Sequence, residues 1–156
     1  MANIIETTDP QILAEMNEEI QTLHYDLYPD VFKPYNFELV EQAFEHFLKD
    51  SDSKAYIAVQ DDVPVGYILF KVKDSIESAF KYSSRTIYVD QVLVLENYKG
   101  AGIGEQLMDQ AYAFAREHEI DRIELDHWSM NLTARYFFDK HGFQYYNERM
   151  YKELSK

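Results

Sequence analysis

A glycine-rich segment constrains this chain more than any other part of its sequence. Residues 99–104 read Lys-Gly-Ala-Gly-Ile-Gly, and they separate the run with the strongest strand character, 86–95, from an amphipathic helical pattern at 102–118. Glycines let the backbone approach a ligand closely, and the free N–H groups at the start of a helix attract an anion. The order of strand, glycines and helix therefore predicts a site for a pyrophosphate group. The alternative is that the glycines only form a tight turn.

Two familiar phosphate motifs do not fit this segment. A dinucleotide-binding loop requires a third glycine at the position of Glu105, and a P-loop requires Gly-Lys-Ser or Gly-Lys-Thr after four intervening residues. A carboxylate at position 105 would also lie unfavourably beside a further phosphate. The segment is therefore specialised for another cofactor, and the diphosphate of CoA or of a nucleotide is a suitable ligand.

The remaining patterns predict a mixed α/β fold in a single domain that spans residues 1–156. Asp9 followed by Pro10 marks the start of a helix, because aspartate caps a helix and proline fits its first turn. We expect 86–95 to be the central strand, and Gly66 predicts a bulge or a close backbone approach. The other predicted elements are a short strand at 3–8, a helix at 36–49, a hairpin of 54–60 with 64–72, a strand at 122–128, a helix at 131–141 and a strand or short hairpin at 142–154.

Composition narrows the classes of partner and compartment. The chain has no cysteine, so it has neither a disulfide framework nor a thiolate metal site, and we expect a cytoplasmic protein. Its formal net charge of −13 repels nucleic acid and anionic membranes and favours cationic ligands. The alternative is that acidity only keeps the protein soluble. The five histidines lack metal-ligand spacing, so no metal is expected.

Two blocks of sequence, taken together, resemble the GNAT superfamily of acyltransferases. The first is Val92-Leu93-Val94 followed by residues 98–104, which is similar to the acetyl-CoA loop of that family, Gln/Arg-x-x-Gly-x-Gly/Ala. The second runs from Asn131 to Phe143 and is similar to the next helix of the family and the strand after it. The resemblance implies a mixed, mostly antiparallel twisted sheet with helices on both faces. Lys99 departs from the usual arginine or glutamine.

The resemblance also implies which residues bind acetyl-CoA as co-substrate. The backbone at 92–94 would pair with the pantetheine arm, and the loop would hold the pyrophosphate while Lys99 adds a point charge. Asn131 resembles a cofactor-contacting asparagine, although a plain helix cap is the alternative. The implied cofactor-binding residues are Val92, Leu93, Val94, Lys99, Gly100, Ala101, Gly102, Ile103, Gly104, Asn131 and Phe138.

Phe138 stands where many members of the family carry a tyrosine that protonates the departing sulfur. A phenyl ring has no proton to donate, and Tyr136 is two positions away, on the opposite face of the helix. The alternative is that Phe138 only packs against the pantetheine. A thiolate leaves readily, since an alkyl thiol has a pKa of about 8.5, so we expect activity without a tyrosine here.

Asp90 is the candidate general base. An amine must lose a proton to attack a thioester, and a carboxylate near the end of the strand at 86–95 can accept it directly or through water. The alternative is an ordinary outward-facing strand carboxylate. Backbone N–H groups near 92–94 would stabilise the oxyanion, and no covalent enzyme intermediate is required.

The acceptor site is predicted from aromatic residues in two segments. The resemblance implies that 24–34 and 143–151 form this pocket, in which rings would surround a cationic amine while Asp26 and Asp30 attract it. The alternative is that these rings belong to the core or to a dimer surface. The candidate substrate residues are Tyr25, Tyr28, Phe32, Tyr145 and Tyr146.

The sequence thus predicts an N-acetyltransferase that transfers an acetyl group from acetyl-CoA to a primary amine, either a cationic small molecule or a peptide. The alternative is a catalytically weak CoA-binding or interaction module that has the same fold. The sequence does not identify the acceptor, and fold analogy does not supply it. A homodimer is a further expectation that comes from the resemblance.

Overall fold

The structure is a computed structural model that describes residues 2–155 of the chain. The chain divides into two compact units, Met1–Asp126 and His127–Lys156. The first contains the sheet and three helices, and the second contains one helix and the C-terminal segment. The expectation of a single domain over 1–156 stays a prediction.

The first unit is built on one five-stranded sheet in the order β1-β2-β3-β4-β5. Neighbouring strands are antiparallel except for β4 and β5, which are parallel, so the predicted mixed, mostly antiparallel sheet is confirmed. The strands are β1 (Asn3–Glu6), β2 (Ser53–Gln60), β3 (Val63–Ser75), β4 (Ser84–Val94) and β5 (Ile123–Leu125).

Two strand predictions were wrong in detail. The central strand is β3 and not β4. A pattern of strand-forming residues reflects how deeply a strand is buried, and β3 is buried without a break over 65–70. The strand predicted at 122–128 is only Ile123–Leu125, since it pairs with β4 over three residues and then turns away. This early end of β5 leaves part of β4 without a neighbour on that side.

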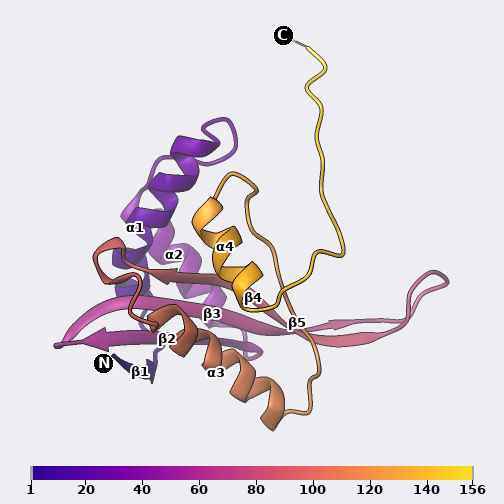
Figure 1. The fold of residues 1–156 in the computed structure, drawn as a ribbon, viewed down its shortest axis with the longest axis horizontal. Helices are drawn as coiled ribbons and strands as arrows, with labels where there is room; N and C mark the ends of the chain where they lie inside the picture. Colours follow the sequence, from indigo (N-terminus) through magenta and orange to yellow (C-terminus); the bar gives the residue numbers. More distant parts are fainter. Residues whose placement is uncertain (1, 156) are drawn as a thin grey trace. The chain divides into compact units, whose positions relative to one another are not determined.

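Helices cover both faces of this sheet, as predicted (Figure 1). Helices α1 (Pro10–Leu27) and α2 (Phe37–Leu48) pack on one face, where Leu13 and Phe44 meet Tyr67 and Leu69 of β3. Helix α3 (Ile103–Glu117) packs on the other face, and the short 3-10 helix η1 (Glu96–Tyr98) precedes it. No helix within the described residues is long and apolar enough to cross a membrane.

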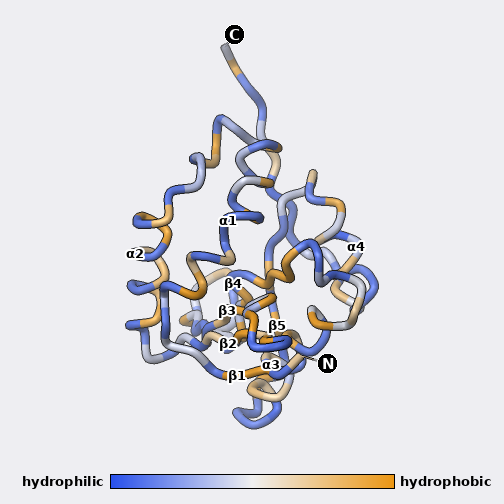
Figure 2. The backbone as a smooth tube through the Cα atoms, turned by 90° about the vertical axis from the view of Figure 1, so that its left-hand side faces the viewer, coloured by the Kyte–Doolittle hydropathy of each residue, from blue (hydrophilic) through white to orange (hydrophobic). Residues whose placement is uncertain are grey.

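Side-chain chemistry explains where these helices begin. Asp9 Oδ1 accepts the N–H of Gln11 at the start of α1, and Asn36 Oδ1 accepts the N–H of Leu39 at the start of α2. Each bond satisfies a backbone donor that the helix itself leaves free. Figure 2 shows the corresponding pattern of hydropathy, in which hydrophobic residues gather along the strands and alternate with polar residues along α1 and α2.

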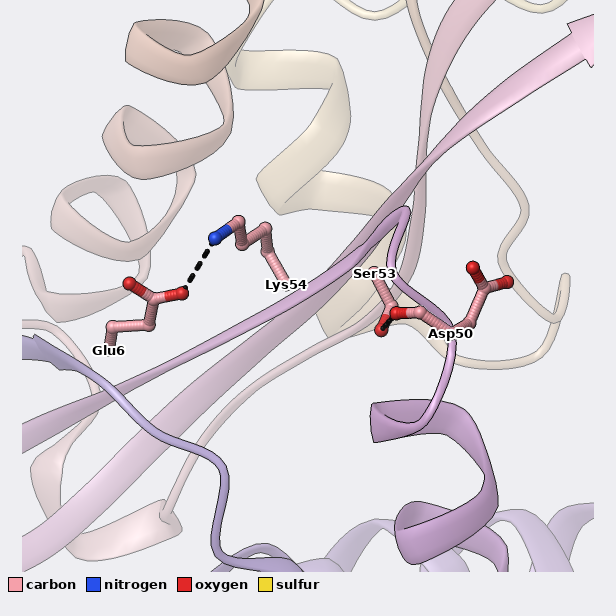
Figure 3. A network of polar contacts seen from close by, with 4 residues as sticks. All are labelled: Glu6, Asp50, Ser53 and Lys54. Atoms are coloured by element: carbon pink, nitrogen blue, oxygen red, sulfur yellow. Dashed lines mark hydrogen bonds and ion pairs between the residues drawn. The ribbon is translucent and has the colours of Figure 1, made fainter.

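Two polar contacts lie at the beginning of the sheet, one between β1 and β2 and one where the chain enters β2 (Figure 3). The Lys54 ammonium of β2 lies 2.8 Å from a Glu6 carboxylate oxygen of β1, and the Ser53 hydroxyl donates to the Asp50 carbonyl at 2.7 Å. The second contact fixes the chain where it passes from α2 into β2. Both contacts are near the surface, so they orient these elements more than they stabilise them.

Short connections link strand β3 to its neighbours β2 and β4. Asp61 and Asp62 both have positive φ, which suits a tight hairpin turn between β2 and β3. A Cβ atom at Gly66 would lie 2.6 Å from the Leu93 carbonyl oxygen, so the predicted close approach is confirmed. Beyond the body of the sheet, β3 and β4 continue as a paired arm whose tip, 76–83, exposes Ile76, Phe80 and Tyr82.

The second unit contains helix α4 (Leu132–Lys140) and the segment after it. Phe138 is buried among the rings of His127, Phe137 and Phe143. The prediction of a strand or hairpin at 142–154 was wrong, because the structure has no strand after α4 up to residue 155. Aromatic residues are frequent there, but a strand also needs a partner for its backbone groups.

Candidate active site

Strand β4 changes its surroundings at Asp90. From Ile87 to Val89 it pairs with β3 on one side and with β5 on the other. The pairing with β5 ends where Val89 meets Leu125. From Gln91 to Val94 the strand pairs with β3, and no other strand of the described chain lies along its second edge. The backbone groups on that edge are free to bind an extended ligand.

Asp90 is the extra residue of a β-bulge. Leu69 of β3 pairs with Gln91 and the next residue of β3, Phe70, pairs with Val89, so Asp90 has no partner. A bulge bends the strand and re-aims the residues around it, and bulges are common beside active sites. No local residue pattern indicates the bulge, because neither glycine nor proline lies near this position.

The bulge decides which amides reach the open edge. The Ile87 N–H donates to the Arg122 carbonyl at 3.0 Å and so faces β5, whereas the Leu95 N–H donates to the Val65 carbonyl at 2.9 Å and so faces β3. Both residues would face the same side of an uninterrupted strand, since backbone groups alternate. The extra residue reverses this alternation. The N–H and C=O groups of Val92 and Val94 therefore point to the open edge.

The Asp90 carboxylate combines access with a perturbed acidity. Its side chain is exposed, yet the protein around it desolvates the carboxylate and raises its pKa above the usual value of an aspartate. The positive charge of Lys71 opposes this shift in pKa without cancelling it. A carboxylate with a raised pKa is a better proton acceptor, which suits a general base.

Tyr67 of β3 and Tyr88 of β4 stay protonated. Desolvation raises the pKa of Tyr67 and of Tyr88, and the charge of Asp90 raises both further. The Tyr88 hydroxyl donates to the Asp126 carboxylate at 2.7 Å, which also keeps the proton in place. Neither phenol is therefore a proton acceptor near neutral pH. Of Tyr67, Tyr88 and Asp90, Asp90 is the group that can accept a proton.

The glycine-rich loop follows β4 and leads directly into α3. Gly100 and Gly102 both have φ of 81°, which is strained for any residue with a side chain. Gly102 caps α3 without a side chain, in contrast to the side-chain caps of α1 and α2. The first N–H groups of α3 thus have no side-chain partner among residues 2–155, which suits an anion. The Lys99 ammonium forms an ion pair of 2.7 Å with Glu96.

A cavity of about 500 Å³ lies between α1 and the end of β4. The Glu19 carboxylate accepts the Glu96 N–H at 2.9 Å, which ties α1 to η1. Glu18 and Asp26 have no hydrogen bond or ion pair within the described part of the chain. Acidic residues thus dominate the polar lining, which consists of Glu18, Glu19, Ile20, Thr22, Leu23, Asp26, Leu93, Glu96 and Lys99.

Sequence reasoning named only Asp26 and Lys99 from the charged lining of this cavity. A signal was present, because Glu18, Thr22 and Asp26 follow one another at intervals of four and so form one stripe along α1. The sequence did not show which residues face that stripe. The structure shows them, since Leu93 of β4 and the η1 residue Glu96 form the opposite wall.

The predicted aromatic residues lie elsewhere. Tyr25, Tyr28 and Phe32 are half-buried near the end of α1, where the rings of Tyr28 and Phe32 are 6.4 Å apart. None of these three residues lines the acidic cavity. Tyr145 and Tyr146 belong to the second unit, where the Tyr145 hydroxyl lies 3.0 Å from His127 Nε2. An aromatic cage built from both groups stays a prediction.

Two residues of the second unit have clear local roles. Asn131 Oδ1 accepts the N–H of Ala134 at 3.2 Å, so its interpretation as a helix cap is confirmed. Phe138 is 7% exposed and Tyr136 is 74% exposed, which places them on opposite faces of α4 as predicted. The predicted contacts of Asn131 and Phe138 with a cofactor stay predictions.

The described residues contain no group of three or more histidine, cysteine, aspartate or glutamate side chains that could hold a metal ion. The candidate site therefore consists of three parts of the first unit. These are the open edge of β4 with Asp90, the glycine-rich loop with the start of α3, and the acidic cavity beside them. This site offers backbone donors and carboxylates to a ligand.

Solved structures share this fold over nearly their whole length. The tetramutant of the BH1408 protein from Bacillus halodurans has a TM-score of 0.91 at 21% identity, covering 97% of this chain and 99% of that chain. The aminoglycoside 6'-N-acetyltransferase AAC(6')-Ih from Acinetobacter baumannii has a TM-score of 0.74 at 13% identity, covering 100% and 99%. AAC(6')-Iy in complex with the bisubstrate analogue CoA-S-monomethyl-acetylneamine has a TM-score of 0.70 at 14% identity, with the same coverage.

Sequence comparison supplies the family. No curated protein matches the chain significantly. The model of the acetyltransferase (GNAT) family matches residues 17–143, which include β4, the glycine-rich loop and both helices after it. This agrees with the resemblance of the two sequence blocks and with the fold of the solved relatives. The chain belongs to the GNAT family of acetyltransferases.

Proposed function

We propose that this chain is an N-acetyltransferase that transfers the acetyl group of acetyl-CoA to a primary amine. Family membership supports acetyl transfer, and the relative with a CoA-containing bisubstrate analogue supports acetyl-CoA as co-substrate. The observation that carries the proposal is the open edge of β4 beside the uncapped start of α3. Together they offer backbone donors for both the extended and the anionic parts of one ligand.

The chain's own backbone would hold the co-substrate. Val92 and Val94 turn their amides to the open edge, so these two residues pair with the pantetheine arm, while Leu93 faces β3. The N–H groups of Ile103 and Gly104 at the start of α3 bind the pyrophosphate. Asn131 and Phe138 are proposed as further contacts on the family resemblance alone.

Asp90 takes the proton in the proposed reaction. The nitrogen lone pair attacks the thioester carbonyl carbon, a C–N bond forms, the C–S bond breaks, and the sulfur leaves with the bonding electron pair. The amine proton passes to the Asp90 carboxylate, directly or through water. The N–H of Val92, the outward amide nearer to Asp90, is suited to stabilise the oxygen anion of the tetrahedral intermediate, which leaves the Val94 N–H to the pantetheine arm. The thiolate leaves without a protein donor or takes its proton from water.

A cationic amine is the proposed acceptor class. The acidic cavity adjoins the open part of β4 through Leu93, and the carboxylates of Glu18 and Asp26 are unpaired there. An ammonium group at its rim would meet several carboxylates, while Ile20 and Leu23 contact an aliphatic chain. The aminoglycoside acetyltransferases among the solved relatives support polycationic acceptors.

Turnover tests this proposal. Purified protein is incubated with acetyl-CoA and separate panels of polyamines, basic peptides, aminoglycosides and amino acids, and release of free CoA thiol is measured. We expect release above background with at least one cationic amine and a lower rate with acidic amino acids. Preference for an anionic acceptor would contradict the cationic class. Binding of acetyl-CoA with no turnover on any amine would favour the interaction-module alternative.

A further inference from the structure

Tyr67 joins three elements of the first unit at one buried point. Its side chain is fully buried, and its hydroxyl donates to Gln91 Oε1 of β4 at 2.6 Å. The same hydroxyl accepts from Asn17 Nδ2 of α1 at 3.0 Å, and that amide lies 3.3 Å from Gln91 Oε1. The three side chains therefore form a closed triangle between α1, β3 and β4. We call it the Tyr67 triangle.

The Tyr67 triangle lies at the bulge. Gln91 is the first residue of β4 that pairs with β3 after Asp90, and Tyr67 pairs with Leu93, two positions further on. The side chain of Tyr67 thus reaches diagonally across the pair to the residue next to Asp90, as neighbours in a sheet can. The triangle bonds the end of the bulge to a helix on the same face of the sheet.

The alternative register of β4 on β3 shows what the hydrogen bond from Tyr67 to Gln91 does. Without the bulge, Gln91 would pair with Ile68, and its amide would turn to the opposite face, where Phe70 meets Phe114 of α3. A slip by one residue moves every side chain to the other face. The buried hydroxyl of Tyr67 and the buried amide of Asn17 would still bond to each other, but both would lose the acceptor oxygen of Gln91. The triangle therefore favours the register in which Asp90 is the extra residue.

Tyr67 cannot itself exchange protons in this position. Burial and the charge of Asp90 raise the pKa of its phenol, so the hydroxyl stays protonated and continues to donate. The chemistry of Tyr67 is therefore that of a fixed donor beside the proposed base.

We infer that Tyr67 is a positioning residue for the reaction: through Gln91 it fixes the bulge, and so holds the Asp90 carboxylate and the outward amides of Val92 and Val94 in their working orientation. This inference rests on the proposed function. Tyr67 itself touches neither substrate nor co-substrate in this role. Asn17 serves the same role from α1 by fixing the hydroxyl of Tyr67.

The test is a double-mutant cycle of Tyr67→Phe with Asp90→Asn. Tyr67→Phe removes one oxygen and keeps the ring in its packing, so the protein folds. We expect kcat to fall about tenfold in the native background and clearly less in the Asp90→Asn background, because the part of the effect that acts through Asp90 is already lost there. Equal falls in the two backgrounds would overturn the inference.

Ile57→Val is the matched control for lost stability. Ile57 belongs to the same hydrophobic cluster as Tyr67 and is 3% exposed, but its side chain has no polar group to bond β4. Trimming it destabilises the core modestly, and kcat at a temperature where the protein is folded should not change. A fall in kcat as large as that of Tyr67→Phe would mean that Tyr67 acts only through stability.

Hydrogen exchange provides a readout that does not depend on activity. In Tyr67→Phe, the amides of Gln91 and Leu93 should exchange at least about tenfold faster, while those of Ile87 and Val89 stay unchanged, because only the bulge loosens. Unchanged exchange at Gln91 and Leu93 would overturn the inference. If Asp90→Asn alone leaves kcat unchanged, the proposed base is wrong, and exchange still decides whether Tyr67 holds the bulge.

Discussion

The two halves of β4 have similar sequences but opposite surroundings. Ile87–Val89 bonds to a strand on each side, whereas Gln91–Val94 bonds to β3 and has an open second edge. Both halves consist mainly of β-branched and aliphatic residues, so side-chain chemistry does not distinguish them. The difference comes from one extra residue and from the early end of β5. A strand becomes a binding edge when its neighbour stops, and the bulge decides which amides are offered.

The largest expected effect concerns the residue that divides the two halves. Asp90→Asn removes the proton acceptor and keeps the shape of the side chain, so kcat should fall by about 10² to 10⁴ with little change in the affinity for acetyl-CoA. Steady-state kinetics with a fixed cationic amine measures the effect. Asp74→Asn is the control, since Asp74 lies on the β3–β4 arm and pairs with Arg85. If kcat of Asp90→Asn stays within about twofold of the native value, Asp90 is not the base.

Proline substitutions distinguish the two halves of β4, because proline removes a backbone N–H and the two halves use their N–H groups differently. The Val94 N–H faces the open edge, so Val94→Pro should fold and yet bind acetyl-CoA about tenfold more weakly, because one amide is lost. Ile87→Pro removes the N–H that bonds to Arg122, so it should destabilise the protein. Thermal unfolding and calorimetry measure the two outcomes. If Val94→Pro unfolds as readily as Ile87→Pro, the assigned direction of the Val94 amide is wrong.

The acidic cavity beside the open half gives a smaller effect. Replacing Glu18 by Gln and Asp26 by Asn removes two unpaired charges that are partly screened by water, so KM for a cationic amine should rise roughly three- to tenfold with kcat nearly constant. Added salt should raise the native KM and raise that of the double variant less, because fewer cavity charges remain to be screened. An unchanged KM in the double variant would place the acceptor elsewhere.

The pH profile gives the smallest shift. Because desolvation raises the pKa of Asp90, the rate should fall as pH decreases through that raised pKa, where the base becomes protonated. Lys71 lowers the pKa of Asp90, so Lys71→Met should move this acid limb to higher pH. Tyr67 and Tyr88, the other titratable groups whose interaction with Asp90 is resolved, stay protonated throughout. A limb that moves to lower pH would contradict the assignment.

Local chemistry made some features predictable. Asp9, Asn36 and Asn131 cap helices through bonds to residues two or three positions away, so their roles could be read from the sequence. The glycines at 100 and 102 were also readable, since the left-handed backbone conformation favours that residue.

Features that depend on distant partners were not predictable. The bulge at Asp90 depends on how the core faces of β3 and β4 match, including the bond from Tyr67 to Gln91. The cavity needed the position of α1 against the end of β4. The segment after residue 142 has a pattern that predicted a strand but no partner strand, and it forms no strand up to residue 155.

Binding of acetyl-CoA to Gly102→Val tests the central claim most directly, with Gly142→Val as the matched control. Both glycines have φ near 82° and open space around an added Cβ atom, so both variants carry the same backbone strain. Titration calorimetry should show that the native protein and Gly142→Val bind acetyl-CoA, and that Gly102→Val binds at least about tenfold more weakly. No binding to the native protein, or equal affinity in all three, would contradict an acetyl-CoA site at this loop.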